Sequence, residues 1–298
     1  MLLLLRFCPS LILGLGLSLI CFQSQADTKD PAKALPQQTD NRILVLQTGS
    51  EETHFGSARL KALGPQTLSI NPDLIYPGTS RYIGVEFNRI FSGLNLPETG
   101  SLILESTDGY QVEMPIELLQ DDALIAYLVL SDIDAPEGSR WRPFQHGSHW
   151  ISLDPFYLVW KARAAEYQAE LESRYELLPW PYQLARIEYT DSDRYRNLRP
   201  SSTDKPELKT GSDIYIKHCI KCHQVSGIGG NLAPDILRDN GLADILDKTT
   251  LLRFIRHIDQ FNPSSAMPVY ADTITEEEAM AIIVYLDWLK AQSEQAAN

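Results

Sequence analysis

The chain has 298 residues, of which 44% are hydrophobic and 22% charged, a composition typical of soluble globular proteins. This length predicts about two domains. The net charge of −13 argues against a general nucleic-acid binder, because phosphate backbones attract surfaces rich in Lys and Arg.

Residues 1–26 are interpreted as a targeting segment and not as part of the fold. An apolar stretch at residues 11–22 follows a positive charge and precedes a small-x-small cleavage site that ends at Ala26. This stretch is shorter than the ~20 residues of a membrane-spanning helix. We therefore expect an exported, periplasmic protein with a cleaved signal peptide and no membrane span after cleavage. Retention of the segment as a membrane anchor, or lipidation at Cys21, are the alternatives. A polar, flexible leader at residues 27–40 is expected to follow.

Residues 41–190 are predicted to form a domain of mixed α and β structure. Its β-rich runs are residues 43–47, 101–105, 126–130 and 182–189. Turn clusters such as Asp108-Gly109 separate them. Residues 156–177 are predicted as a helix, because three charged residues there lie at i, i+4 spacing, which is typical of a solvated helix face.

Residues 191–206 are charged and rich in Ser and Pro, which predicts a linker. Residues 207–298 form the last domain, with three helical segments around a glycine-rich loop and a proline-bracketed loop. The helical segments are residues 208–217, 249–260 and 276–290. Thr275 is the expected N-cap of the third, with Glu278 three residues later. The apolar stripe that makes it a core helix is Ala279, Ile282, Ile283, Leu286 and Leu289.

The sequence Cys219-Ile220-Lys221-Cys222-His223 has the C-x-x-C-H spacing of covalent haem c attachment. Two thiols one helical turn apart can each add to a haem vinyl group, and the adjacent imidazole then lies under the iron. Signal cleavage would leave Cys219 and Cys222 as the cysteines of the mature chain, so in an oxidising compartment a disulfide is the alternative.

Two other interpretations of the cysteine pair are weaker. A thioredoxin-like C-x-x-C follows a strand in a βαβ unit, whereas this pair ends a helix. A structural zinc site needs four ligands. The nearby candidates His218, Cys219, Cys222 and His223 are too close in sequence for all four to face one ion. We therefore predict one covalent haem c.

Haem iron in electron transfer usually takes a second axial ligand, commonly a methionine thioether. Met267 is the best candidate, because Pro263 and Pro268 hold its segment out of a helix and can present the side chain to a metal. Met280 lies beside the apolar stripe of a core helix, where packing is the simpler role. Met114 lies in the other domain.

Histidines and a glycine-rich loop complete the predicted haem site. His218 adjoins the attachment motif and cannot easily reach the opposite haem face, and His257 is placed on the surface of a helix by the apolar periodicity. Bis-histidine ligation is therefore the weaker alternative. Glycines in the loop 227–234 permit close approach to a flat cofactor. The Pro234 carbonyl is the expected acceptor for the second ring nitrogen of His223.

Residues 207–291 resemble a class I monohaem cytochrome c domain. The segments that carry the resemblance are GSDIYIKHCIKCHQ, the glycine loop ending LAPDI, SSAMPVY and the final helix EEEAMAIIVYLDWL. The resemblance implies an all-α fold with an exposed haem edge, ligation by His223 and Met267, and one-electron transfer. His/Met ligation raises the reduction potential.

Residues 81–190 resemble the molybdopterin-binding domain of the sulfite oxidase family. The resemblance is carried by GVEFNRIF, SLILESTDGYQVEMPIELLQDDALIAYLVL and PYQLARIEYTD, and implies an α+β fold with a mixed sheet. Those enzymes bind molybdenum through a cysteine thiolate, and this region contains no cysteine. We therefore expect a non-catalytic domain without molybdopterin.

A cluster of cations, histidines and aromatics at residues 140–150 is a candidate anion site, with Arg140, Arg142, His146 and His149 as its possible contacts. The alternative is a polar, aromatic loop packed on the sheet. We favour this alternative, because no glycine-rich phosphate loop or helix N-terminus accompanies the cluster.

These features predict an exported c-type cytochrome that passes single electrons between a redox partner protein, or a membrane electron-transport chain, and an acceptor. The first domain would dock that partner or seat the haem domain, which makes the chain an electron-transfer protein more than a stand-alone enzyme. One alternative is a haem-containing oxidoreductase whose first domain binds a pterin or small anion. A second alternative is a haem-based sensor in which Met267 leaves the iron.

Overall fold

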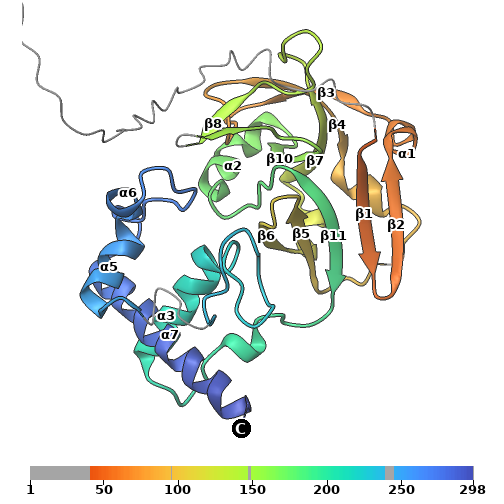
Figure 1. Cartoon of the computed structure of the whole chain (residues 1–298). Helices are drawn as coiled ribbons and strands as arrows, with labels where there is room; N and C mark the ends of the chain where they lie inside the picture. The colour runs from red at the N-terminus through yellow and green to blue at the C-terminus, as the bar shows by residue number, and fades with distance from the viewer. Residues whose placement is uncertain (1–40, 95, 147–148, 239–244, 298) are drawn as a thin grey trace, which may run out of the picture.

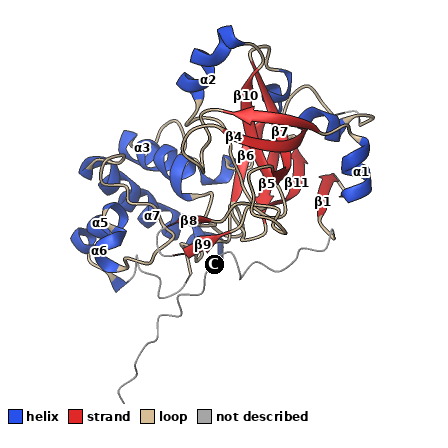
Figure 2. Cartoon of the chain, turned by 90° about the horizontal axis from the view of Figure 1, so that it is seen from above, coloured by secondary structure: helices blue, strands red, loops and turns tan. Residues whose placement is uncertain are grey.

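The computed structural model describes residues 41–94, 96–146, 149–238 and 245–297. They form a sheet-rich region followed by a helical region that lies beside it (Figure 1). Seen from above, α3, α5, α6 and α7 gather on one side of the strands (Figure 2). The expected targeting segment and leader lie outside the described residues. Among the helices that are described, none has the length and apolar character needed to cross a membrane.

Two sheets and one hairpin make up the sheet-rich region. The first sheet has the order β2-β1-β11-β5-β6, the second has the order β10-β7-β4-β3, and β8 pairs with β9. The strands are β1 (Ile43–Thr48), β2 (Glu51–Gly56), β3 (Gln66–Ile70), β4 (Ser80–Glu86), β5 (Ser101–Ser106), β6 (Gln111–Pro115), β7 (Leu124–Asp132), β8 (Phe144–His146), β9 (His149–Ile151), β10 (Tyr157–Ala162) and β11 (Leu184–Thr190). β1 and β11 pair in parallel and the other neighbours are antiparallel, so the first sheet is mixed as predicted.

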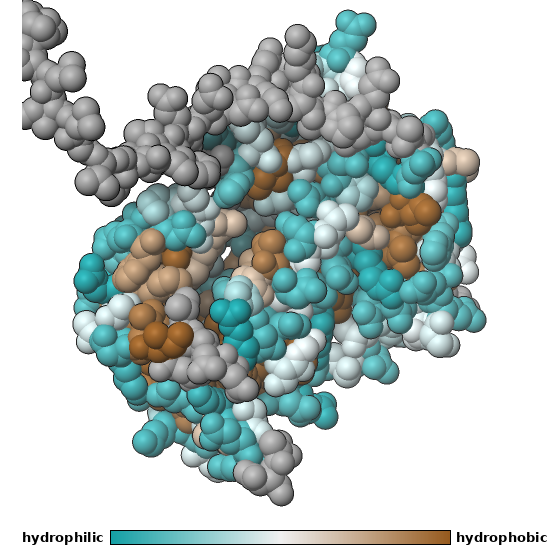
Figure 3. Space-filling view, in the orientation of Figure 1, coloured by the Kyte–Doolittle hydropathy of each residue, from teal (hydrophilic) through white to brown (hydrophobic). Residues whose placement is uncertain are grey.

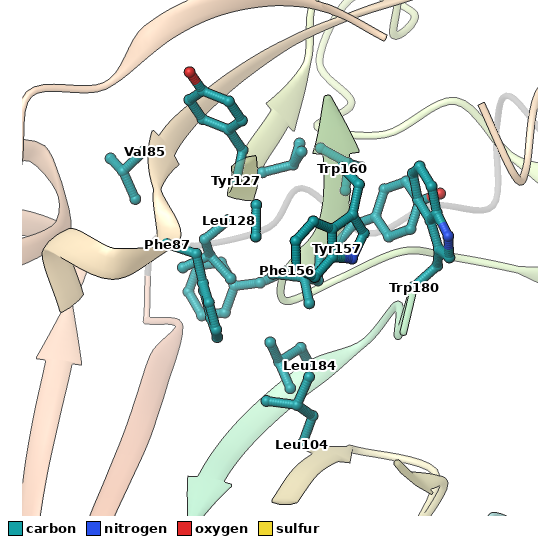
Figure 4. Packing of buried hydrophobic residues seen from close by; sticks show 14 of the residues in the cluster. Val85, Phe87, Leu104, Tyr127, Leu128, Phe156, Tyr157, Trp160, Trp180 and Leu184 are labelled. Carbon is teal, nitrogen blue, oxygen red and sulfur yellow. The ribbon is translucent and has the colours of Figure 1, made fainter. Parts of the chain in front are cut away.

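Short helices connect these strands. They are α1 (Ser57–Ala62), α2 (Gln168–Arg174) and the 3₁₀ turns η2 (Phe87–Phe91), η3 (Ile116–Gln120) and η4 (Ala165–Tyr167). The four predicted β-rich runs correspond to β1, β5, β7 and β11 and are confirmed. One hydrophobic core joins the two sheets, with Leu104 and Leu184 from the first facing Leu128 and Phe156 from the second (Figure 4).

The helix predicted over residues 156–177 is wrong in its first part. β10 occupies residues 157–162 and pairs antiparallel with β7, and every side chain from Tyr157 to Trp160 is 0% exposed. A strand that is buried on both faces shows no alternation of polar and apolar residues, so its pattern cannot be distinguished from that of a buried helix. The i, i+4 spacing of charged residues corresponds only to the short helix α2, where Arg174 contacts Glu170 at 3.0 Å.

The helical region has its own hydrophobic core. Its elements are the 3₁₀ turn η5 (Arg196–Leu198), α3 (Pro206–Ile214), the π turn η6 (Tyr215–Cys219), α5 (Lys248–Arg256), α6 (Ile258–Phe261) and α7 (Glu276–Ala297). α3 and α7 pack closely at Gly211, where a Cβ atom would lie 2.1 Å from the carbonyl oxygen of Ala281. The predicted stripe of α7 is buried in this core.

The predicted N-terminal cap of α7 is confirmed. The backbone N–H of Thr275 donates to Glu278 Oε2 at 2.8 Å, and the N–H of Glu278 donates to Thr275 Oγ1 at 3.2 Å. This reciprocal pair is a capping box, which satisfies two N–H groups that a helix start leaves without partners. It explains why the helix begins where the sequence places it.

The segment predicted as a linker packs against the helical region. Tyr195 and Leu198 are buried in the helical core, and the Leu198 carbonyl accepts a 2.6 Å hydrogen bond from the Tyr285 hydroxyl. The segment was predicted as a linker because residues 191–206 are mostly polar, and two apolar residues alone do not form a recognisable pattern.

Candidate haem site

The attachment motif lies where the first helix of the helical region ends. α3 passes into the π turn η6, in which the N–H of Ile220 donates to the Tyr215 carbonyl at 3.0 Å. The N–H of His223 then donates to the Cys219 carbonyl at 2.9 Å, so Cys219 and His223 lie within one helical turn. A helix over residues 208–217 was predicted, but not its π turn, a feature common at functional sites.

The two thiols are not joined in a disulfide, and both side chains are half-buried. Burial raises the pKa of Cys219 to about 12 and that of Cys222 to about 11. Both thiols are therefore protonated at neutral pH. A redox pair of the thioredoxin kind instead has a thiol with a lowered pKa. The electrostatics of this pair argue against that alternative.

The imidazole of His223 is held by backbone groups. Its Nδ1–H donates to the Pro234 carbonyl at 2.9 Å, the acceptor that the sequence led us to expect. The Tyr215 hydroxyl donates to the His223 carbonyl at 2.9 Å. Burial lowers the pKa of His223, which favours the neutral ring. With Nδ1 protonated, Nε2 keeps the lone pair that a metal requires.

The glycine-rich loop approaches the backbone of the attachment motif itself. A Cβ atom on Gly230 would lie 1.9 Å from the Lys221 carbonyl oxygen, and one on Gly229 would lie 2.5 Å from the Ile220 carbonyl oxygen. The N–H of Gly230 donates to the Ile220 carbonyl, and the N–H of Ala233 donates to the Cys222 carbonyl. From the sequence, these glycines are expected to permit close approach to the cofactor. In the structure, two of them allow the loop to close on the attachment turn and bring Pro234 to His223.

The Met267 loop is held at both ends. The N–H of Met267 donates to Ser265 Oγ at 3.1 Å, and its side chain is half-buried. Beyond it, Arg256 donates to the carbonyls of Ala271 and Ile274 at 2.9 Å each. Sequence reasoning missed Arg256, because a helical arginine with backbone partners shows no pattern of its own.

The competing methionines and histidines have other surroundings. Met114 is buried in the sheet-rich core, and Met280 is partly buried against the helical core. His218 lies edge-on to Tyr270 with ring centroids 5.8 Å apart. His257 was predicted to lie within a helix over residues 249–260. That helix instead breaks at His257, where φ is −131° and ψ is 54°, into α5 and α6.

The turn between β5 and β6 contacts the attachment motif. The N–H of Gln111 donates to the Lys221 carbonyl at 2.9 Å, and the Gly109 carbonyl accepts from the N–H of Asn231 at 2.9 Å. Gly109 has φ of +93°, and a Cβ atom there would lie 1.8 Å from Asn231 Oδ1. The sequence predicted a turn at Asp108-Gly109, but a turn signal carries no information about what the turn packs against.

The β8–β9 hairpin contacts the Met267 loop. His149 donates from Nε2 to the Ser264 carbonyl at 2.9 Å. Among the described residues, hydrogen bonds therefore join the sheet-rich region both to the attachment motif and to the loop that carries Met267. His149 lies in β9 opposite His146 of β8.

The candidate anion contacts Arg140 and Arg142 both have carboxylate partners. Arg140 Nη1 lies 2.9 Å from Asp154 Oδ1, and Arg142 Nε lies 2.6 Å from Oδ2 of the buried Asp132. The Arg142 guanidinium also stacks on the Tyr76 ring, 4.0 Å from its centroid. Both arginines therefore have partners within the fold, and the role of the cluster at residues 140–150 stays a prediction.

The groups present suit haem c. Two thiols outside a disulfide are three residues apart, an imidazole follows with its Nδ1 held by a carbonyl, and a thioether lies in a proline-bracketed loop. These are the donors that covalent attachment and axial ligation require.

Comparisons with known proteins agree with this chemistry. Residues 206–286 match the family model described as cytochrome c oxidase, cbb3-type, subunit III. No curated protein matches the chain. Residues 206–286 of the helical region are therefore a cytochrome c domain, which implies covalently bound haem c, haem-based electron transfer and a redox partner or electron-transport chain.

Proposed function

We propose that the chain is an exported, periplasmic c-type cytochrome that carries one haem, attached through Cys219 and Cys222 and ligated by His223 and Met267. The observation that carries this proposal is the 2.9 Å hydrogen bond from His223 to Pro234, which orients a neutral imidazole beside two thiols. When bound, haem c supplies a one-electron iron couple. The chain's residues orient the imidazole and hold the Met267 loop.

The sheet-rich region is proposed to act as a docking module without catalysis of its own. Its turn at Gly109 and its hairpin at His149 support this role, because they contact the attachment motif and the Met267 loop. Residues 41–190 contain no cysteine to bind molybdenum. The relation of this region to the sulfite oxidase family stays a prediction. A molybdenum and pterin inventory tests the rival oxidoreductase, which requires a stoichiometric signal.

The partner is proposed to be a redox protein or a membrane electron-transport chain. The matching family is described as a subunit of a cytochrome c oxidase, which supports a respiratory chain as the partner. The chain's net charge of −13 favours a partner with a basic docking surface.

Met267→Ala tests the axial ligand, with Met280→Ala as the matched control. We expect Met267→Ala to abolish the methionine–iron charge-transfer band and to lower the reduction potential, because a thioether ligand raises it. Met280→Ala should keep both. A wild-type spectrum that is already high-spin would instead favour the haem-based sensor. Loss of the band in Met280→Ala alone would reassign the ligand.

A further inference from the structure

A cleft of about 550 Å³ lies between the two regions. The sheet-rich region contributes Tyr110, Tyr175 and Trp180 to its walls, and the helical region contributes Lys217, Ile220 and Lys221. The surface is hollowed between the two regions in the view of Figure 3. This volume falls in the range of small-molecule sites, roughly 300–1,000 Å³.

The helical region places two positive charges on the cleft, those of the exposed Lys217 and of Lys221. Among the described residues, the ammonium groups of Lys217 and Lys221 have no hydrogen bond or ion pair. Lys221 is half-buried. Because an ammonium group out of water is costly without a partner, the site favours an anion.

The other charged groups on the cleft do not neutralise these lysines. Arg199 lies 3.3 Å from Asp213 and 3.7 Å from Asp193, so its charge is already balanced. Glu176 is exposed, and among the described residues neither Glu176 nor Glu113 forms an ion pair with either lysine. The inner cation at Lys221 therefore stays uncompensated.

The opposite wall is apolar and partly exposed. Leu177 is 72% exposed and Leu74 is 48% exposed, although both line the cleft. The rings of Tyr175 and Trp180 lie next to each other with centroids 4.7 Å apart. Large apolar side chains left exposed together around a concave surface are typical of a ligand site.

We propose that this cleft binds a small amphipathic organic anion, a planar apolar ring system that carries one acidic group. The acidic group pairs with Lys221 and Lys217, and the ring system packs on the apolar wall formed by Trp180, Tyr175 and Leu177. The ligand contacts both regions, and one of its contacts is the residue between the two haem-attaching cysteines. Binding therefore stabilises the arrangement in which the sheet-rich region contacts the attachment motif.

Isothermal titration of the haem-loaded full chain with 2-naphthoate tests the proposal, with neutral 2-naphthamide as the matched ligand. We expect one site per chain and a Kd for 2-naphthoate at least about tenfold below that for the amide, because only the acid forms a charge-assisted pair. Lys221→Gln should weaken 2-naphthoate about tenfold and leave 2-naphthamide unchanged. Lys209→Gln, which changes an exposed lysine of α3 outside the cleft, should leave both unchanged.

A second variant tests the apolar wall without changing the lysines. Leu177→Asp should weaken both ligands, and its haem content should match that of the wild type, because Leu177 is exposed. Equal affinities of the acid and the amide, wild-type affinity in Lys221→Gln, or no binding at millimolar ligand would each overturn the proposal. The assay measures binding and not electron transfer, so its failure leaves the proposed cytochrome function untouched.

Discussion

The two regions of this chain differ in how their charged and metal-ligating side chains are held in place. In the sheet-rich region, buried charges are paired within the fold, as Arg142 is with Asp132. In the helical region, Cys219, Cys222 and Met267 are half-buried and are positioned by backbone contacts around them. Some buried polar atoms of the sheet-rich region nevertheless have no hydrogen-bond partner among the described residues, as is the case for Gln111 Oε1 and the Tyr157 hydroxyl. The helical region presents thiols, an imidazole and a thioether from irregular segments, which are the groups that haem c requires.

The strongest test of this comparison truncates one core residue in each region. Leu128→Ala and Ile282→Ala remove side chains that are 0% and 2% exposed, and each should cost about 2–5 kcal/mol of unfolding free energy. Because each residue belongs to a different core cluster, we expect Leu128→Ala to shift tryptophan circular dichroism and Ile282→Ala to shift haem absorbance in denaturant titrations. Equal shifts of both probes in both variants would show one cooperative unit.

The glycine loop gives a test inside the helical region. Gly230→Ala should cost about 3 kcal/mol and reduce haem incorporation, because its Cβ would overlap the Lys221 carbonyl oxygen. Gly227→Ala is the matched control, since its φ is +82° but open space surrounds its Cβ position, and it should cost about 1 kcal/mol. Thermal unfolding and haem absorbance per chain measure both effects. Equal losses of stability and of haem content in the two variants would show that the close contact at Gly230 contributes to neither.

The capping box of α7 gives the smallest expected effect. Thr275→Ala removes the acceptor for the N–H of Glu278 and should cost about 1 kcal/mol, while Thr275→Ser should keep most of the stability. The effect should appear in the haem absorbance transition and not in that of the sheet-rich region. A serine variant as unstable as the alanine variant would show that the hydroxyl has no role.

Sequence reasoning succeeded where the signal is local. The capping box at Thr275, the strands β1 and β5, and the contact between His223 and Pro234 all follow from residues near one another in the chain. β10 could not be predicted, because its side chains are buried on both faces and lack periodicity.

Contacts between distant segments lay beyond the sequence. The Gly109 turn looks like any hairpin turn, and only the fold brings it to the attachment motif. The same is true of His149, whose partner Ser264 is 115 residues away. The cleft that Lys221 lines lies between the two regions that these contacts join.

The haem content of the purified protein tests the central claim most directly. A pyridine haemochrome assay on protein made with cytochrome-maturation machinery, together with intact-mass analysis, should give one covalent haem per chain. The double variant Cys219→Ser, Cys222→Ser should retain no haem after acid–acetone extraction, because it lacks the two thiols that form covalent bonds to the haem. A wild-type chain whose mass shows no haem, or whose haem is fully extracted, would contradict the account.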